Sequence, residues 1–399
     1  MTATVLNNSS LTEPFTVETG VKQGCIIAPT LLSVFIAAIL HLINKELPHG
    51  IPIWYRTDGR LFNLNRFKAK TKIRTTTVVE LQYADDNAIA AHSAEDLQGI
   101  LNSFAKAYRA LGLTVNIKKT QVLHQPPPNQ PSTPPIINVD NTALEYVHHF
   151  PYLGCFLSSK ADIDSEVNHR LSWASGAYAR LRKRVFEDRD LRVDTKLLVY
   201  KAAVLPTLLY GAESWTTYSR HLRALEQHHQ RTLRKILRIK WVDRRTNISV
   251  PEEARIPSIT TLIMQHQLRW TGHLLRMADI RLPKQMLYSQ LERGPRAPGG
   301  QKKRFKDKLK TNLKKFQITS RDWERIALNR NCWRAAVQEG AAHHEKELRR
   351  VAETKRQLRK ERQKQAPARP QPTTTFPCPH CTKICGSRIG LYAHLRTHK

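Results

Sequence analysis

The sequence predicts an α+β protein in which strands, helices and a cysteine–histidine motif follow one another along the chain. Short β-prone runs separated by turn residues occupy residues 1–160. Apolar residues at helical spacing, with many lysines and arginines between them, continue through residues 161–245 and 246–365. A Pro- and Thr-rich stretch at 366–375 predicts a flexible linker, and the cysteine–histidine spacing in residues 376–399 predicts a small ββα unit.

The chain is strongly basic. Its 399 residues contain 65 Lys and Arg against 33 Asp and Glu, which gives a formal net charge of +32. Such an excess favours a polyanionic partner, with nucleic acid as the first candidate and an anionic membrane surface as the second. The longest apolar run, Leu31 to Ile43, is too short to span a bilayer. We therefore expect a buried core helix there and no membrane partner.

Local patterns predict the first elements. Five cations at alternate positions should lie on one face of a strand, either following a nucleic-acid backbone or protecting a sheet edge: Arg66, Lys68, Lys70, Lys72 and Arg74. A helix should occupy residues 93–111 with Ser93 as its N-cap, because apolar residues recur there at helical spacing. A strand at 113–115 should follow it.

Between these elements lies Tyr83-Ala84-Asp85-Asp86. β-Prone residues on both sides predict a hairpin with the acidic pair at its tip. Adjacent carboxylates repel each other unless they are solvated or neutralised by a divalent cation, and their hard oxygen atoms suit Mg²⁺. Two-metal phosphoryl transfer needs ligands of this kind. The alternative is a turn in which the aspartates serve only the backbone conformation.

Helical patterns dominate the chain after residue 160. They cover residues 162–200, 194–209, 220–239, 251–277 and 340–365. The helix at 220–239 should present a one-sided basic surface to a phosphate backbone, formed by Arg231, Arg234, Lys235, Arg238 and Lys240. The basic run Lys302 to Lys306 predicts a nuclear-localisation or phosphate-binding patch.

The strongest spacing signal lies near the C-terminus. Cys378, Cys381, His394 and His398 form the pattern C-x₂-C-x₁₂-H-x₃-H, which is typical of a C₂H₂ zinc finger. Two thiolates on a knuckle and two imidazoles one helical turn apart can close a tetrahedron around Zn²⁺. A unit of this size does not fold without its metal, so we expect the zinc to be structural.

The expected finger carries few groups that could identify bases. Counting back from His394, the base-contacting positions are Ser387, Gly390 and Ala393. Glycine and alanine have no hydrogen-bonding side chain. We therefore expect either a protein contact or weak, non-specific nucleic-acid contact through Lys383, Arg388, Arg396 and Lys399.

Four motifs together resemble one polymerase family. Gly20 to Pro29, Tyr83 to Asp86, Gly112 to Thr120 and Phe150 to Cys155 occur in the order found in the reverse transcriptases of non-LTR (LINE-like) retrotransposons. The resemblance covers roughly the first 160 residues closely and the helices after them more loosely. It implies a partial right-hand polymerase palm followed by a helical thumb. The implied activity is an RNA-directed DNA polymerase that extends a nicked DNA end on an RNA template in the nucleus.

The resemblance also implies roles for single residues. Asp85 and Asp86 would hold catalytic Mg²⁺, and Tyr152 and Gly154 would contact the primer. Contacts with the template or the incoming nucleotide would come from Lys22, Gln23, Gly24, Tyr83, Lys118 and Lys119. In physical terms, glycine lets the backbone approach a ligand closely, glutamine offers an amide to a base or sugar edge, and lysine offers charge to a phosphate.

One carboxylate that the family needs is missing. It lies on a strand upstream of the Gly20–Pro29 segment and shares the metals, whereas the first aspartate of this chain is Asp58. We therefore expect a truncated reverse transcriptase that starts inside the palm and is inactive alone. Its expected partners are RNA, DNA and the missing N-terminal part of a polyprotein. The alternative is a non-catalytic nucleic-acid-binding zinc-finger protein.

Overall fold

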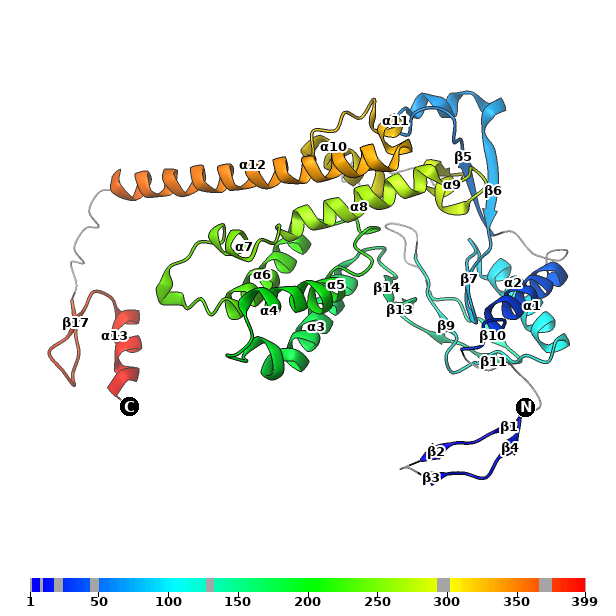
Figure 1. Ribbon diagram of the computed structural model, residues 1–399, viewed down its shortest axis with the longest axis horizontal. Helices are drawn as coiled ribbons and strands as arrows, with labels where there is room; N and C mark the ends of the chain where they lie inside the picture. Colours follow the sequence, from blue (N-terminus) through cyan, green and yellow to red (C-terminus); the bar gives the residue numbers. More distant parts are fainter. Residues whose placement is uncertain are drawn as a thin grey trace. The chain divides into compact units, whose positions relative to one another are not determined.

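The computed structural model describes residues 2–7, 10–17, 24–43, 50–126, 133–292, 302–365 and 375–398. Helices and small, mostly antiparallel sheets are mixed along the chain, which confirms the α+β class (Figure 1). The contacts form two compact units, Met1–Glu345 and Lys346–Lys399. No helix among the described residues is both long enough and apolar enough to cross a membrane.

The first unit begins with a narrow antiparallel ladder. In it β1 (Thr2–Ala3) pairs with β4 (Phe15–Thr16), and β2 (Leu6–Asn7) pairs with β3 (Ser10–Leu11). Each strand is only two residues long. The ladder therefore contributes little apolar burial of its own.

Helix α1 (Ala28–Ile43) occupies the apolar run. The helix was predicted, but the expectation that it is buried is wrong. Ile39 and Ile43 pack in a core with α2, whereas Leu31 and Val34 are 51% and 63% exposed. A run that is apolar on all sides does not indicate which of its faces the neighbouring helix covers.

The acidic stretch forms the predicted hairpin. Strands β7 (Glu80–Tyr83) and β8 (Asp86–Ile89) pair so that Tyr83 lies opposite Asp86, which leaves Ala84 and Asp85 in the turn. Helix α2 (Ala94–Ala110) follows and begins as predicted, because the Ser93 side chain accepts a hydrogen bond from the backbone of Asp96.

Further short strands lead to a second hairpin. Strand β9 (Gln121–Val122) runs parallel to β12 (Glu145–Tyr146), and β10 (Asn138–Val139) pairs with β11 (Thr142–Ala143). The second hairpin consists of β13 (His149–Tyr152) and β14 (Cys155–Ser158) and contains the Phe150 to Cys155 motif.

The strand predicted at 113–115 is absent. These residues have no regular structure, and the chain turns at Asn116, whose carbonyl accepts a hydrogen bond from the Thr120 amide at 3.0 Å. A short apolar triplet does not by itself form a strand, because a strand also needs a pairing partner.

A helical core follows the second hairpin. Helix α3 (Asp164–Leu181) continues into the π-helical turn η3 (Arg182–Phe186). A second continuous stretch consists of α4 (Val193–Val199), η4 (Tyr200–Val204) and α5 (Leu205–Leu208). Helices α6 (Ser219–Ile236), α7 (Ser249–Ala254) and α8 (Ile259–Arg276) complete it.

One apolar core runs through all these helices. It includes Tyr200 and Leu225 as well as Val250 and Ile259, so the boundary predicted at residue 245 does not separate two cores. The predicted helix at 251–277 is interrupted between α7 and α8. Ser258 caps α8 there, and the preceding Pro257 cannot continue a helix because it lacks the backbone N–H.

A second core combines the segment 51–78 with residues from α8 to the first part of α12 (Arg330–Gln365). Strands β5 (Ile51–Tyr55), β6 (Arg74–Val78) and β15 (Ser289–Leu291) form one antiparallel sheet. The helices around the core are α9 (Leu282–Tyr288), α10 (Phe305–Lys315), α11 (Trp323–Leu328) and the first part of α12. Leu61, between β5 and β6, is buried with Leu268 and Trp323. Residues 51–78 thus pack with the C-terminal helices, as Figure 1 also shows.

The basic strip does not form the predicted strand. Most of it lies in two 3-10 turns, η1 (Leu64–Lys68) and η2 (Lys70–Lys72). Arg66 is buried and donates a hydrogen bond through Nη2 to the carbonyl of Tyr288 at 2.7 Å. The strand prediction is therefore wrong. Cations at alternate positions also occur outside strands, and here Arg66 is buried against the second core.

The second unit contains the end of α12 and the C-terminal motif. Strands β16 (Phe376–Pro377) and β17 (Ile384–Cys385) pair antiparallel, and α13 (Arg388–Leu395) follows with the short turn η6 (Arg396–His398). The order of elements is ββα. The linker predicted at 366–375 lies almost entirely outside the described residues.

The contact between α8 and α12 gives a test of the second core. A Cβ atom added at Gly272 would lie 2.2 Å from Nε1 of Trp333, which is itself hydrogen-bonded to the carbonyl of Leu268. We expect Gly272→Ala to lower the free energy of unfolding by about 1–3 kcal/mol through overpacking, measured by urea denaturation.

Gly176→Ala is the matched control, because its added Cβ has no neighbour within 4 Å in helix α3. We expect this substitution to be neutral or to stabilise the chain by about 0.5–1 kcal/mol. Equal effects of the two substitutions would contradict the packing of Trp333 on Gly272.

Candidate polymerase and metal sites

Asp85 and Asp86 lie at the exposed end of the first hairpin. Asp85 is in the turn, and Asp86 begins β8 opposite Tyr83, which is 66% exposed. Neither aspartate forms an ion pair with a described residue. Their oxygen atoms are therefore available to a cation such as Mg²⁺. In the described part of the chain, no third metal-binding residue joins them in a cluster.

The second hairpin lies against the first. The Tyr152 hydroxyl donates a hydrogen bond to the carbonyl of Leu81 on β7 at 2.8 Å. Burial raises the pKa of Tyr152, and the negative charge of Asp86 raises it further, so the phenol keeps its proton. The structure thus brings together three residues to which the sequence assigned roles: Asp86, Tyr83 and Tyr152.

A buried ion pair holds the turn of the second hairpin. Arg170 on α3 forms a hydrogen-bonded ion pair with Glu166 (Nε–Oε1 2.7 Å), and both side chains are almost fully buried. Glu166 also accepts a hydrogen bond from the Phe156 amide at 2.7 Å, and Arg170 donates to the carbonyl of Gly154. The backbone of Gly154 has a φ of +76°, a left-handed conformation that glycine adopts without the steric cost of a Cβ atom.

Sequence reasoning missed this pair. The available signal was an acid and a base four residues apart, Glu166 and Arg170, on the apolar stripe of a helix rather than on its polar face. Such a position predicts that the two charges are buried together.

The other predicted contact residues do not converge on the acidic pair. Lys118 and Lys119 are exposed in the turn after Asn116, and neither side chain bonds Asp85 or Asp86 within the described residues. Gly24 adopts φ +86 just before α1. Lys22 and Gln23 lie outside the described residues.

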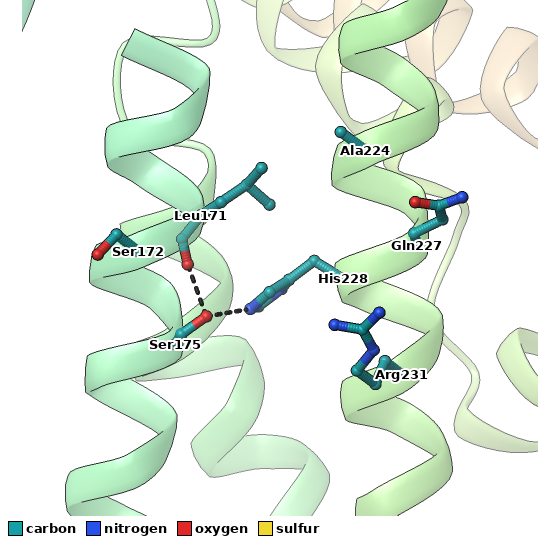
Figure 2. A pocket seen from close by; sticks show the side chains of 7 residues that line it. All are labelled: Leu171, Ser172, Ser175, Ala224, Gln227, His228 and Arg231. Atoms are coloured by element: carbon teal, nitrogen blue, oxygen red, sulfur yellow. Dashed lines mark hydrogen bonds between the residues drawn. The ribbon is translucent and has the colours of Figure 1, made fainter. Parts of the chain in front are cut away.

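An open groove of about 340 Å³ lies between α3 and α6, and we call it the α3–α6 groove (Figure 2). No carboxylate lines it. Three residues that line it have side-chain hydrogen-bond donors without a partner among the described residues: Ser172, Gln227 and Arg231. Arg231, Lys235, Arg238 and Lys240 of the predicted basic surface are exposed, while Arg234 is half-buried and bonds Asn247. The groove is therefore suited to an anion.

A serine and a histidine meet in this groove, as Figure 2 shows. Ser175 Oγ lies 3.2 Å from Nε2 of His228 and donates to the carbonyl of Leu171 at 2.7 Å. Burial, and then the charges of Arg231 and Lys235, lower the pKa of His228, so the ring is neutral and donates through Nε2. Ser175 is thus an acceptor toward His228, the opposite of an activated nucleophile.

The cysteine and histidine atoms of the C-terminal unit converge. Cys381 Sγ lies 3.1 Å from His394 Nε2, and Cys378 Sγ lies 3.5 Å from His398 Nε2. All four ligand atoms lie within 4.8 Å of one another. A tetrahedral zinc ion with Zn–S bonds of about 2.3 Å and Zn–N bonds of about 2.0 Å fits a cluster of this size.

The basic run at 302–306 is engaged by the fold. Lys302 Nζ donates to the carbonyl of Lys160 at 2.7 Å, and the Lys303 amide donates to the Tyr218 hydroxyl at 3.0 Å. Lys306 donates to the carbonyl of Ser289, and burial lowers its pKa to about 7. Hydrogen bonds therefore hold this run within the first unit, although the residues Lys302, Lys303 and Arg304 remain exposed.

Comparison with known proteins identifies relatives of the part of the chain that holds the two hairpins. Residues 1–157 match the family model described as reverse transcriptase (RNA-dependent DNA polymerase). A transposon-derived protein of Caenorhabditis elegans is 24% identical over 284 residues, which cover 67% of this chain and 97% of the relative. The RNA-directed DNA polymerase from the mobile element jockey of Drosophila melanogaster is 22% identical, covering 60% of this chain and 24% of the relative.

The Pol polyprotein from the type-1 retrotransposable element R2 of Popillia japonica is 22% identical, covering 56% of this chain and 33% of the relative. The chain thus spans about a quarter to a third of these polymerases. Its first part is a reverse transcriptase domain. The chain is thus similar to the polymerases of non-LTR retrotransposons and to a transposon-derived relative.

The buried ion pair gives a second test. Arg170→Ala would leave Glu166 buried without its partner, so we expect a loss of about 3–5 kcal/mol in the free energy of unfolding. The control is Arg182→Ala, which breaks an exposed pair with Glu187 and should cost at most about 1 kcal/mol. Urea denaturation measures both, and similar losses would show that Arg170 does not anchor the hairpin.

Proposed function

We propose that Asp85 and Asp86 are the metal-binding carboxylates of an RNA-directed DNA polymerase site in a partial palm. The observation that carries this proposal is the acidic hairpin tip, which lies inside the segment that matches reverse transcriptases. It has no ion pair to a described residue and is joined through Tyr152 to a second hairpin. The two carboxylates would hold Mg²⁺, which would neutralise the phosphates of an incoming nucleotide.

The remaining roles follow the family order. Tyr152 and Gly154 would support the primer end, because the hairpin that carries them contacts β7. The template and the nucleotide would be contacted by Lys22, Gln23, Gly24, Tyr83, Lys118 and Lys119. RNA would be the template and DNA the primer, so we also propose that the chain acts in the nucleus, where target DNA lies.

We further propose that this chain does not polymerise alone. A two-metal site needs more ligands than a single carboxylate pair, and the described residues gather no third ligand around Asp85 and Asp86. Another part of a longer polyprotein would supply it. The α3–α6 groove, which no carboxylate lines, supports the second candidate function: a non-catalytic protein that binds nucleic-acid backbones.

Primer extension tests whether the chain polymerises alone, and template binding tests both functions. The purified chain is incubated with an RNA template, a DNA primer and Mg²⁺, beside an Asp85→Ala/Asp86→Ala variant, and template binding is recorded at several salt concentrations. We expect salt-dependent binding by both proteins and extension by neither. Extension that disappears in the variant would overturn the proposed inactivity and establish the acidic pair as catalytic. Failure to bind would contradict both functions.

We also propose that Cys378, Cys381, His394 and His398 hold a structural Zn²⁺ in a C₂H₂ finger. The convergence of their four ligand atoms, with no carboxylate in the cluster, supports zinc. The metal would replace the apolar core that so short a segment lacks.

The zinc content of the chain and of two variants tests this ligand assignment. We expect the purified chain to contain one equivalent of zinc by elemental analysis and Cys381→Ser to lose most of it, because each thiolate is one of four ligands. His380→Ala is the control: His380 lies between the cysteines but outside the ligand cluster, so its loss should leave the zinc content unchanged. Loss of zinc from His380→Ala and not from Cys381→Ser would contradict the ligand set.

A further inference from the structure

The outer face of α13 carries an aromatic side chain between two cations. Arg388, Tyr392 and Arg396 follow one another at four-residue spacing, so they line one side of the helix and its final turn, about 6 Å apart along the axis. Tyr392 is 67% exposed, and Ile389 beside it is 83% exposed. The finger therefore displays a flat apolar ring flanked by positive charge.

The same helix has little to offer to the base edges of a duplex. Ser387 is the N-cap, and its Oγ accepts a hydrogen bond from the Gly390 amide at 3.0 Å. Gly390 and Ala393 have no side-chain donor or acceptor. Sequence recognition in the major groove depends on such donors and acceptors at these positions, so α13 is poorly equipped for it.

The charge of the finger indicates an anionic ligand. Residues 375–398 contain no aspartate or glutamate, whereas Lys383, Arg388 and Arg396 are exposed. The preceding part of α12 is also rich in lysine and arginine. A single-stranded nucleic acid combines a phosphate backbone with bases whose faces are open, whereas the bases of a duplex are already stacked on one another. Aromatic side chains beside cations bind such strands without sequence preference.

We propose that Tyr392 is a stacking platform for an unpaired base of single-stranded RNA or DNA, with Arg388 and Arg396 holding the adjacent phosphates. This inference rests on the proposed nucleic-acid-binding function and on the proposed zinc. It assigns to the finger a preference for single strands, in place of recognition of a duplex sequence.

The test uses the full chain with zinc bound and a single-stranded RNA oligonucleotide that contains 5-bromouracil. We expect ultraviolet irradiation to crosslink the RNA to the peptide that contains Tyr392, and a fully paired duplex to give no crosslink there. Tyr392→Ala should weaken binding of the single strand about 5- to 100-fold, with an unchanged salt slope, because stacking releases no counterions. Tyr392→Phe should retain most of the affinity, since it keeps the ring.

The matched control is Ile384→Ala, which removes a 65% exposed apolar side chain from β17 of the same finger. It should bind like the unsubstituted chain, and unchanged zinc content would show that every variant remains folded. Equal crosslinking to single strand and duplex, or equal affinities of Tyr392→Ala and Tyr392→Phe, would overturn the inference. Binding of RNA with no crosslink at Tyr392 would overturn it while leaving the proposed function intact. No RNA binding at all would overturn both.

Discussion

The placement of the candidate polymerase site depends on one buried guanidinium, that of Arg170. It pairs with Glu166, donates to the carbonyl of Gly154 and lies 4.6 Å from the ring centroid of Tyr210. The Tyr210 hydroxyl in turn donates to the Leu153 carbonyl in the same turn. Arginine can make these contacts together because its donors lie in one rigid plane, whereas lysine offers a single ammonium group. The turn of the second hairpin is therefore fixed to the helical core.

The acidic hairpin depends on this anchor because it has little stability of its own. Among the described strands, β7 and β8 pair only with each other, and a two-stranded sheet is at best marginally stable in water. Val79 and Ile89 pack on the core of α1 and α2. The bond from Tyr152 to Leu81 joins the hairpin to the anchored turn. Core packing thus extends through Arg170 and Tyr152 to the two carboxylates.

Local features were predictable from the sequence, and non-local ones were not. The two hairpins, the Ser93 cap and the cysteine–histidine cluster each depend on residues close together in the chain, and the structure has all of them. The burial of Arg66, the exposed face of α1 and the pairing of β5 with β15 depend on partners far away in the chain. Periodicity shows that a face is apolar or basic, but it does not show what covers that face.

The proposed polymerase chemistry and the proposed nucleic-acid binding differ in how they tolerate the loss of a single contributing side chain. Metal chemistry needs all its ligands at one point, so we expect a metal site with only Asp85 and Asp86 to have lost nearly all activity. Binding to a polyanion is a sum of separate contacts, each of which contributes independently to the affinity. The contacts proposed for this chain are spread over the α3–α6 groove and the C-terminal unit, within a chain of net charge +32. The proposed binding therefore does not need the complete set of metal ligands that the proposed polymerase chemistry needs.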